Sequence, residues 1–168
     1  MILAELICFL LMVVVFAIWG KKLYKQTVDL KRLDNGFREY YEVVSRWLVL
    51  KNSGRKVEEF FIHNGFLRIA VYGAGPLGEL LCQELKNSPV EVVCAIDKNK
   101  KEFEFLDGVK IITPEVIEEQ GSFDAVIITP MLHKTEIMDF LCNKNLVKDT
   151  KFIMVDEFVN FYYHHEEE

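Results

Sequence analysis

The stretch that decides the fold is Leu67–Asp97, LRIAVYGAGPLGELLCQELKNSPVEVVCAID. A short run rich in β-branched residues, Leu67–Tyr72, leads into the glycine-rich turn Gly73–Gly78, and a helical pattern follows the turn. Glu91–Ile96 is a second run of the same kind as the first. A strand, a glycine turn, a helix and another strand in this order are typical of a βαβ unit, whose two strands are parallel.

The alternation continues to the C-terminus. Further strands are expected at Val109–Ile112, Ala125–Ile128 and Lys151–Val155, with helices beginning near Pro114, Pro130 and Asp156. Short links between such elements require parallel strands joined by right-handed crossovers. The sequence therefore predicts an α/β fold with a Rossmann-like open parallel sheet of about five strands, in the order 3-2-1-4-5.

The glycine spacing has a chemical logic in this setting. Gly73 permits a tight turn, Gly75 lets a phosphate approach the backbone, and Gly78 lets the helix pack closely on the strand, so that the helix N-terminus faces the anion. Asp97 ends the second strand, where a ribose-binding carboxylate belongs, and an acid there favours NAD over NADP. The alternative is that the glycines serve packing alone and that Asp97 caps a turn.

The predicted ligand site combines this loop with neighbouring strand ends. Thr129 belongs to the second of two Ile-Ile-Thr-Pro repeats, in which Thr is expected to cap a helix and Pro to occupy its first position. It also ends a strand at the edge where open α/β sheets bind ligands. The predicted cofactor-binding residues are Gly73, Ala74, Gly75, Pro76, Leu77, Gly78, Asp97, Lys98 and Thr129.

Catalytic and metal-binding residues are not assigned. Only Tyr72, His133 and Lys134 lie near the same sheet edge as proton-transfer candidates, and a lone histidine at a helix start is more often a surface residue. No metal is expected, because the chain has no CxxC or His/Cys cluster. The cofactors that fit are NAD or a nucleotide-sugar.

The N-terminus has a different composition. Residues 1–20 contain 18 apolar residues, interrupted only by Glu5 and Gly20. As a helix, Ile2–Trp19 reaches about 27 Å, close to the ~30 Å hydrocarbon layer of a bilayer. Lysines follow directly, as on the cytoplasmic side of a membrane helix. We therefore predict a single-pass membrane protein, with a transmembrane anchor at residues 1–20, bilayer contact through residues 2–19, the N-terminus outside and the following domain in the cytoplasm. A buried helix is the alternative.

Charge and composition divide the rest of the 168 residues. Residues 21–56 carry a net charge of +6 and residues 57–168 carry −11, which together with Glu5 give the total of −6. An acidic domain argues against nucleic acid as a partner. The predicted layout is an anchor at 1–20, a basic juxtamembrane segment at 21–66 that forms a helical hairpin broken near Asn52–Gly54, a Rossmann-like nucleotide-binding domain at 67–163, and an acidic tail at 164–168.

The middle of the chain resembles a known group of proteins. The residues that carry the likeness are Trp47-Leu48, Lys51, Gly54, Phe60-Phe61, Asn64-Gly65-Phe66, Ile69–Gly78 and Ala95–Asn99. Over roughly residues 40–160 the sequence is similar to Rossmann-like modules of bacterial surface-polysaccharide proteins, which occur beside glycosyltransferases and methyltransferases. It is also similar to the N-terminal nucleotide-sugar-binding domain of sugar O-acyltransferases. The resemblance implies that the glycine loop and Asp97 line a nucleotide or nucleotide-sugar pocket.

Three functions remain open at this stage. The first is a membrane-anchored module that binds NAD or a nucleotide-sugar and is accessory to cell-envelope polysaccharide biosynthesis, with a glycosyltransferase or other envelope-assembly protein as partner. The second is a small NAD-dependent sugar-modifying enzyme. The third is a ligand-free Rossmann scaffold for protein–protein interaction. Without an attached transferase domain, a non-catalytic or partner-dependent module is favoured over an enzyme.

Overall fold

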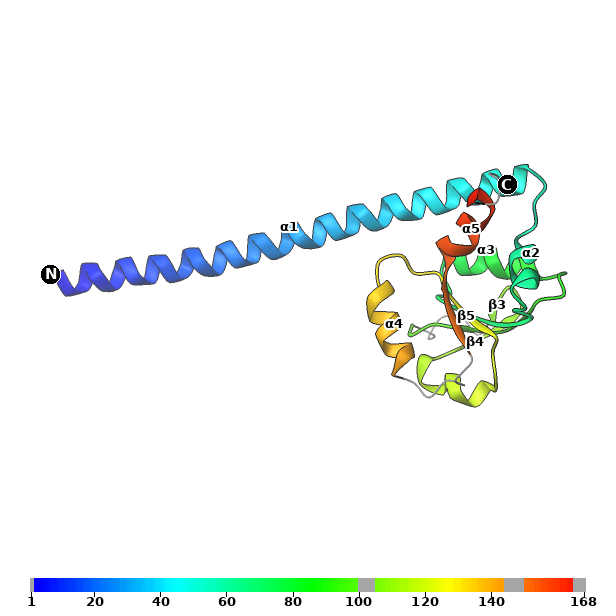
Figure 1. Cartoon of the computed structure of the whole chain (residues 1–168). Coiled ribbons are helices and arrows are strands. Elements are labelled where there is room, and N and C mark those ends of the chain that lie inside the picture. The colour runs from blue at the N-terminus through cyan, green and yellow to red at the C-terminus, as the bar shows by residue number, and fades with distance from the viewer. Residues whose placement is uncertain (1, 100–104, 144–149, 165–168) are drawn as a thin grey trace. The chain divides into compact units, whose positions relative to one another are not determined.

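The computed structural model describes residues 2–99, 105–143 and 150–164. The chain divides into two compact units, Met1–Glu39 and Tyr40–Glu168. The helix α1 (Ile2–Asn52) supplies the first unit and the beginning of the second (Figure 1). The predicted anchor and the first helix of the predicted hairpin are therefore one helix that runs through Gly20 without a break. The predicted break near Asn52–Gly54 is confirmed, because α1 ends at Asn52 and a short helix α2 (Val57–His63) follows.

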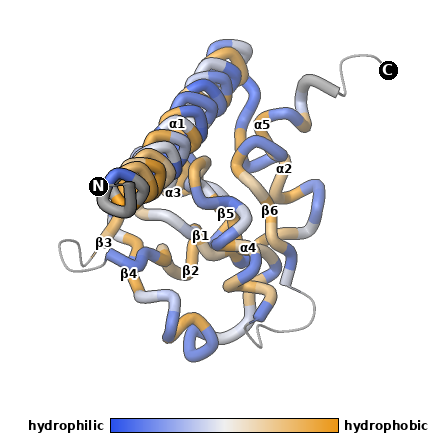
Figure 2. Tube along the Cα trace, turned by 90° about the vertical axis from the view of Figure 1, so that its left-hand side faces the viewer, coloured by the Kyte–Doolittle hydropathy of each residue, from blue (hydrophilic) through white to orange (hydrophobic). Residues whose placement is uncertain are grey.

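The predicted transmembrane anchor at residues 1–20 is wrong. Within the described residues, no helix contains an apolar stretch long enough to cross a bilayer. Among the described side chains, exposed apolar residues are concentrated between Phe9 and Trp19, in the first part of α1. Beyond it hydrophilic residues become more frequent, as Figure 2 shows. The predicted single-pass topology with an external N-terminus is therefore also wrong. The predicted bilayer contact through residues 2–19 depended on the same anchor.

The second unit is built on a sheet in the order β3-β4-β2-β1-β5-β6. The five strands expected from the sequence are parallel neighbours in the predicted order 3-2-1-4-5. The sheet is nevertheless mixed and six-stranded, because β3 pairs antiparallel with β4. The strands are β1 (Arg68–Tyr72), β2 (Glu91–Ile96), β3 (Phe105–Leu106), β4 (Val109–Ile112), β5 (Ala125–Ile128) and β6 (Lys151–Met154).

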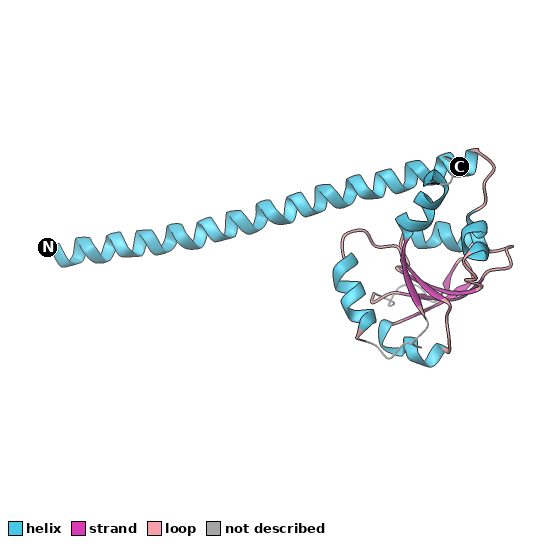
Figure 3. Cartoon of the chain, viewed as in Figure 1, coloured by secondary structure: helices cyan, strands magenta, loops and turns pink. Residues whose placement is uncertain are grey.

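Helices cover both faces of the sheet (Figures 1 and 3). Alternate residues of a strand point to opposite faces; in β1, Ile69 and Val71 join one buried cluster, and Ala70 and Tyr72 join the other. The first cluster includes α2, α3 (Pro76–Leu85), α5 (Val155–His164) and the end of α1; the second includes the 3-10 helix η2 (Pro114–Gln120) and α4 (Lys134–Cys142). This is the layered arrangement of a doubly covered α/β sheet.

The helix expected to begin at Pro130 begins later. In α4 the first helical residue is Lys134, and His133 is the N-cap. Pro114, by contrast, opens η2 after Thr113, although the Thr113 side chain makes no capping hydrogen bond. In the first repeat Thr113 is therefore the N-cap and Pro114 follows it, as predicted, whereas the prediction is wrong for the second repeat, in which the threonine hydroxyl is used elsewhere.

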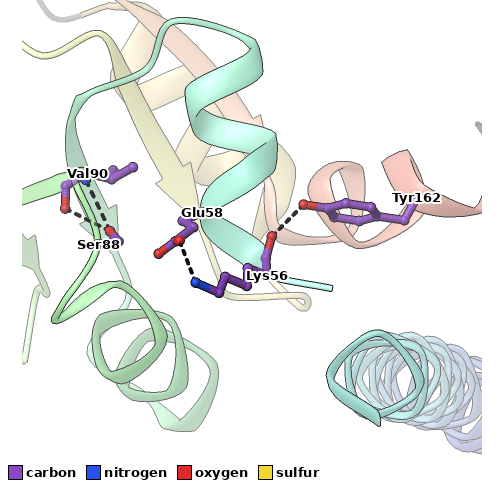
Figure 4. Close-up of polar contacts among 5 residues, drawn as sticks. All are labelled: Lys56, Glu58, Ser88, Val90 and Tyr162. Carbon is purple, nitrogen blue, oxygen red and sulfur yellow. Dashed lines mark hydrogen bonds and ion pairs between the residues drawn. The ribbon is translucent and has the colours of Figure 1, made fainter. Parts of the chain in front are cut away.

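Tyr162 of α5 forms two hydrogen bonds with the backbone at the start of α2. Its hydroxyl donates to the Lys56 carbonyl at 2.7 Å and accepts the Phe60 N–H at 3.1 Å (Figure 4 shows the first of these bonds). Burial raises the pKa of Tyr162 above its usual value, so the hydroxyl keeps the proton that it donates at neutral pH. One side chain thus joins α5 to the start of α2.

We expect Tyr162→Phe to lower the free energy of unfolding by about 1–3 kcal/mol, because the buried Phe60 N–H loses its partner while the ring remains. Urea titration of the full chain measures the change. Tyr41→Phe is the matched control, since the Tyr41 side chain is 72% exposed and its hydroxyl is open to water. Equal stability of the two variants would contradict the role given to Tyr162.

Candidate functional site

The glycine loop joins β1 to α3 at the carboxyl edge of the central strands. The Gly73 N–H donates to the Ile96 carbonyl at 2.8 Å, which extends the pairing of β1 with β2 by one residue. Gly73 then turns the chain with a φ of 101°, and a Cβ there would lie 2.6 Å from Thr129 Oγ1. Only glycine fits both that dihedral angle and that contact.

Gly78 is fixed by a different contact. A Cβ on Gly78 would lie 2.0 Å from the carbonyl oxygen of Gly73. The first turn of α3 therefore lies directly against the end of β1, as the third glycine of such a loop was expected to allow. The roles predicted for Gly73 and Gly78 thus follow from contacts within the chain.

At position 75, by contrast, no contact with the described residues requires a glycine. The φ of Gly75 is −85° and its ψ is −173°, which other residues also adopt, and a Cβ there would meet no atom within 4 Å. Gly75 is also exposed and forms the N-cap of α3, without a side-chain capping hydrogen bond. Because Pro76 has no N–H, the N–H groups of Leu77 and Gly78 are the first in the helix, and neither has an intrahelical acceptor. This is a backbone surface suited to an anion.

Asp97 lies beside the loop, as predicted, and holds it. Its Oδ2 accepts the Ala74 N–H at 2.9 Å, and its Oδ1 accepts the Asn99 N–H at 2.7 Å. The turn-capping alternative is therefore realised in part. A carboxylate has about four acceptor sites, so two hydrogen bonds leave capacity for ribose hydroxyls. Lys98 follows on the surface.

Thr129 is placed at the loop but is buried, with 4% exposed. Its hydroxyl lies 3.0 Å from the Tyr72 carbonyl oxygen and 3.2 Å from that of Gly73, and its N–H donates to Tyr72 at 2.9 Å. These contacts join the end of β5 to the end of β1. Thr129 therefore helps to hold the start of the loop in place through the Tyr72 and Gly73 carbonyl groups.

The three proton-transfer candidates have different surroundings. Tyr72 is buried, and burial together with the charges of Asp97 and Glu115 raises its pKa. His133 lies 2.9 Å from Glu136, and Lys134 lies 3.9 Å from Asp156 of α5. Two of the three are thus occupied by neighbours on α4 and α5, and the third keeps its proton at neutral pH.

Two features of the site were missed from the sequence. The link from Asp97 to the Ala74 N–H was not predicted, although an acid at the end of the second strand is its signal. Glu115, in the first turn of η2, adds negative charge near Tyr72; an acid shortly after the strand Val109–Ile112 is the sequence signal for it.

Metal ligands are not grouped in the part of the chain that the structure describes: no three His, Cys, Asp or Glu side chains there are placed to hold an ion. Cys82 and Cys94 are buried, and burial raises the pKa of each thiol to about 12. Thiols with such pKa values are poor metal ligands and nucleophiles near neutral pH. His165 of the C-terminal tail lies outside the described residues.

Comparison with known proteins identifies one family. No curated protein matches the chain, and no solved structure matches it. The sequence model described as "C2185-like, N-terminal" matches residues 66–153, which include the glycine loop, Asp97 and all six strands except the end of β6. That match covers more than half of the 168 residues, and the chain belongs to the C2185-like N-terminal family.

Proposed function

We propose that this chain binds a phosphate-bearing nucleotide, NAD or a nucleotide-sugar, at the Gly73–Gly78 loop. The observation that carries the proposal is Gly75: two glycines of the loop are required by contacts inside the chain, and the third faces open space at an uncapped helix N-terminus. A residue without a side chain at this point lets a phosphate reach the backbone N–H groups.

Asp97 supports the sugar side of the same ligand. Its carboxylate lies one hydrogen bond from the loop and retains free acceptor sites for the two hydroxyls of a ribose. A negative charge there repels a 2′-phosphate, so the preferred dinucleotide is NAD rather than NADP.

We further propose that the chain is a binding module that serves a partner, such as a glycosyltransferase or another envelope-assembly protein of polysaccharide biosynthesis. The surroundings of His133, Lys134 and Tyr72 support a module over a sugar-modifying enzyme, because His133 pairs with Glu136, Lys134 lies near Asp156, and Tyr72 is buried. The link to polysaccharide biosynthesis rests on the sequence resemblance over residues 40–160.

A second candidate is a Rossmann scaffold that binds no ligand. Two observations favour it: Asp97 accepts hydrogen bonds from two backbone N–H groups, and Thr129 is buried. Both side chains therefore have structural roles that need no ligand. In that case Gly75 is open without being used.

Titration calorimetry of the full chain with NAD, NADP, UDP-glucose and coenzyme A tests the proposal. We expect NAD or UDP-glucose to bind, and Gly75→Glu to weaken that binding at least about tenfold, because the new side chain and its negative charge occupy the open space through which the phosphate reaches the backbone N–H groups. The variant should fold, since Gly75 has an ordinary backbone conformation and an acid is favourable at a helix N-terminus.

Gln83→Glu is the matched control, because it adds the same charge on an exposed position of α3 away from the loop. It should bind as the wild type does. Absence of binding to every probe, or equal affinity of wild type and Gly75→Glu, would reject the nucleotide site and leave the ligand-free scaffold.

A further inference from the structure

A heptad repeat runs along α1 and is not used by the nucleotide site. Positions separated alternately by four and three residues are apolar with one exception, the polar Gln26. This spacing is the a/d pattern of a coiled-coil seam, and one polar layer in such a seam commonly fixes the register of two helices. The repeat positions are Leu23, Gln26, Leu30, Leu33, Phe37, Tyr40, Val44 and Trp47.

The C-terminal end of this repeat already packs within the second unit. Trp47 is 2% exposed, and its ring contacts that of Phe158 edge to face, with 5.0 Å between the ring centroids. Val44 is half-buried against the core cluster that contains these two rings. Trp47 and Val44 therefore belong to the hydrophobic core of the second unit and are not available to a partner helix.

The earlier positions of the repeat are uncovered. Leu23 is 56% exposed, Leu30 66%, Leu33 42% and Phe37 64%. A continuous stripe of large apolar side chains in water is unfavourable and marks an interaction surface. We call Leu23, Leu30, Leu33, Phe37 and Tyr40 the seam.

The described helices of the chain other than α1 cannot cover the seam. They have 7 to 10 residues each, or at most about 15 Å, whereas Leu23 to Tyr40 spans about 26 Å. A partner must be a long helix with the same heptad spacing, because each a or d side chain fits between four residues of the facing helix. A second α1 has this length and this spacing.

The charges along α1 agree with a single pairing face. Lys25, Lys31, Arg32 and Arg38 occupy b and c positions, on the side away from the seam. A helix with an apolar stripe and a mostly basic opposite face pairs along that stripe; on the opposite face Tyr24 and Val28 are the exposed apolar exceptions. We propose that the seam of α1 packs against the seam of a second copy of this chain, so that the protein is a homodimer joined by a coiled coil.

Sedimentation equilibrium of the full chain gives the test. A mild non-ionic detergent keeps the exposed apolar residues Phe9–Trp19 in solution. The expected result is twice the 19.6 kDa chain mass at micromolar concentration. Leu30→Glu combined with Leu33→Glu should raise the dissociation constant at least about 100-fold, because it buries charges in the interface.

Val28→Glu combined with Asn35→Glu is the matched control. Both residues are exposed and lie at f positions, opposite the seam, so the same added charge should leave the dimer intact. Leu30→Ala with Leu33→Ala keeps strong helix formers in place and should also weaken the dimer, which separates loss of the seam from loss of the helix.

A wild-type chain that stays at 19.6 kDa at tens of micromolar, or a dimer that persists in both seam variants, would overturn the proposal. Loss of the dimer in the control pair to the same degree as in the seam pair would do so as well. Nucleotide binding is measured separately and does not affect any of these outcomes.

Discussion

Gly78→Ala is expected to lower the free energy of unfolding by about 3–5 kcal/mol, among the largest effects that a single methyl group can have. The new Cβ would lie 2.0 Å from the Gly73 carbonyl oxygen, which is a backbone atom and cannot rotate away as a side chain could. Either α3 must move off the sheet or β1 must end earlier. Urea unfolding followed by near-ultraviolet circular dichroism measures the loss.

Gly75→Ala is the matched control for this variant. It adds the same methyl group in the same loop, where no atom lies within 4 Å and the backbone φ of −85° is ordinary. Its stability should stay within about 1 kcal/mol of the wild type. If Gly78→Ala were as stable as Gly75→Ala, the close approach of α3 to β1 would be disproved.

Trp47→Ala should destabilise the second unit by a similar amount, about 3–5 kcal/mol, the usual loss for a large buried aromatic side chain. Trp47 is almost fully buried, and its ring stacks edge to face on Phe158 of α5. Removing it leaves a cavity where the end of α1 meets the rest of the unit. The same urea transition reports the change.

Trp47→Phe separates packing from hydrogen bonding. The Trp47 Nε1 is buried without a hydrogen-bond partner among the described residues, so phenylalanine loses volume but also removes an unsatisfied donor. We expect it to cost clearly less than alanine does. Leu48→Ala should have little effect, because Leu48 is 56% exposed, and a large loss there would contradict the assignment of the buried face.

The strand order could be predicted because local rules determine it. Short links between Leu67–Tyr72, the α3 helix and Glu91–Ile96 leave only parallel strands and right-handed crossovers. The five predicted strands, numbered along the chain, lie in the predicted order 3-2-1-4-5, which in the structure is β4-β2-β1-β5-β6. The structural need for Gly73 and Gly78 was likewise predictable, since their spacing reflects the packing of a helix against the preceding strand.

The antiparallel edge strand was missed although it has a local signal. Asp107 and Gly108 both have positive φ, 48° and 88°, and Asp-Gly is a strong hairpin sequence. The flanking strand β3 is only Phe105–Leu106, too short to show alternation. A pattern of two residues carries no periodicity, so the turn alone had to be recognised.

The predictions for Thr129 and for the N-terminal anchor were wrong for different reasons. A Thr-Pro pair fits a helix start, but the Thr129 hydroxyl finds carbonyl acceptors at the end of β1, and α4 starts only at Lys134. The anchor prediction weighed the hydrophobicity of residues 1–20 by itself, whereas α1 continues to Asn52 and no bilayer-length apolar stretch is found in its described residues.

The attachment of α1 through Trp47 also affects how the long helix forms. Starting a helix is the costly step, since several residues must be ordered before the first hydrogen bond compensates, whereas each later residue adds a bond of its own. The stretch Tyr40–Asn52, held by packing within the second unit, supplies that first turn permanently. We therefore expect the helical order of residues 2–39 to decrease when the second unit unfolds.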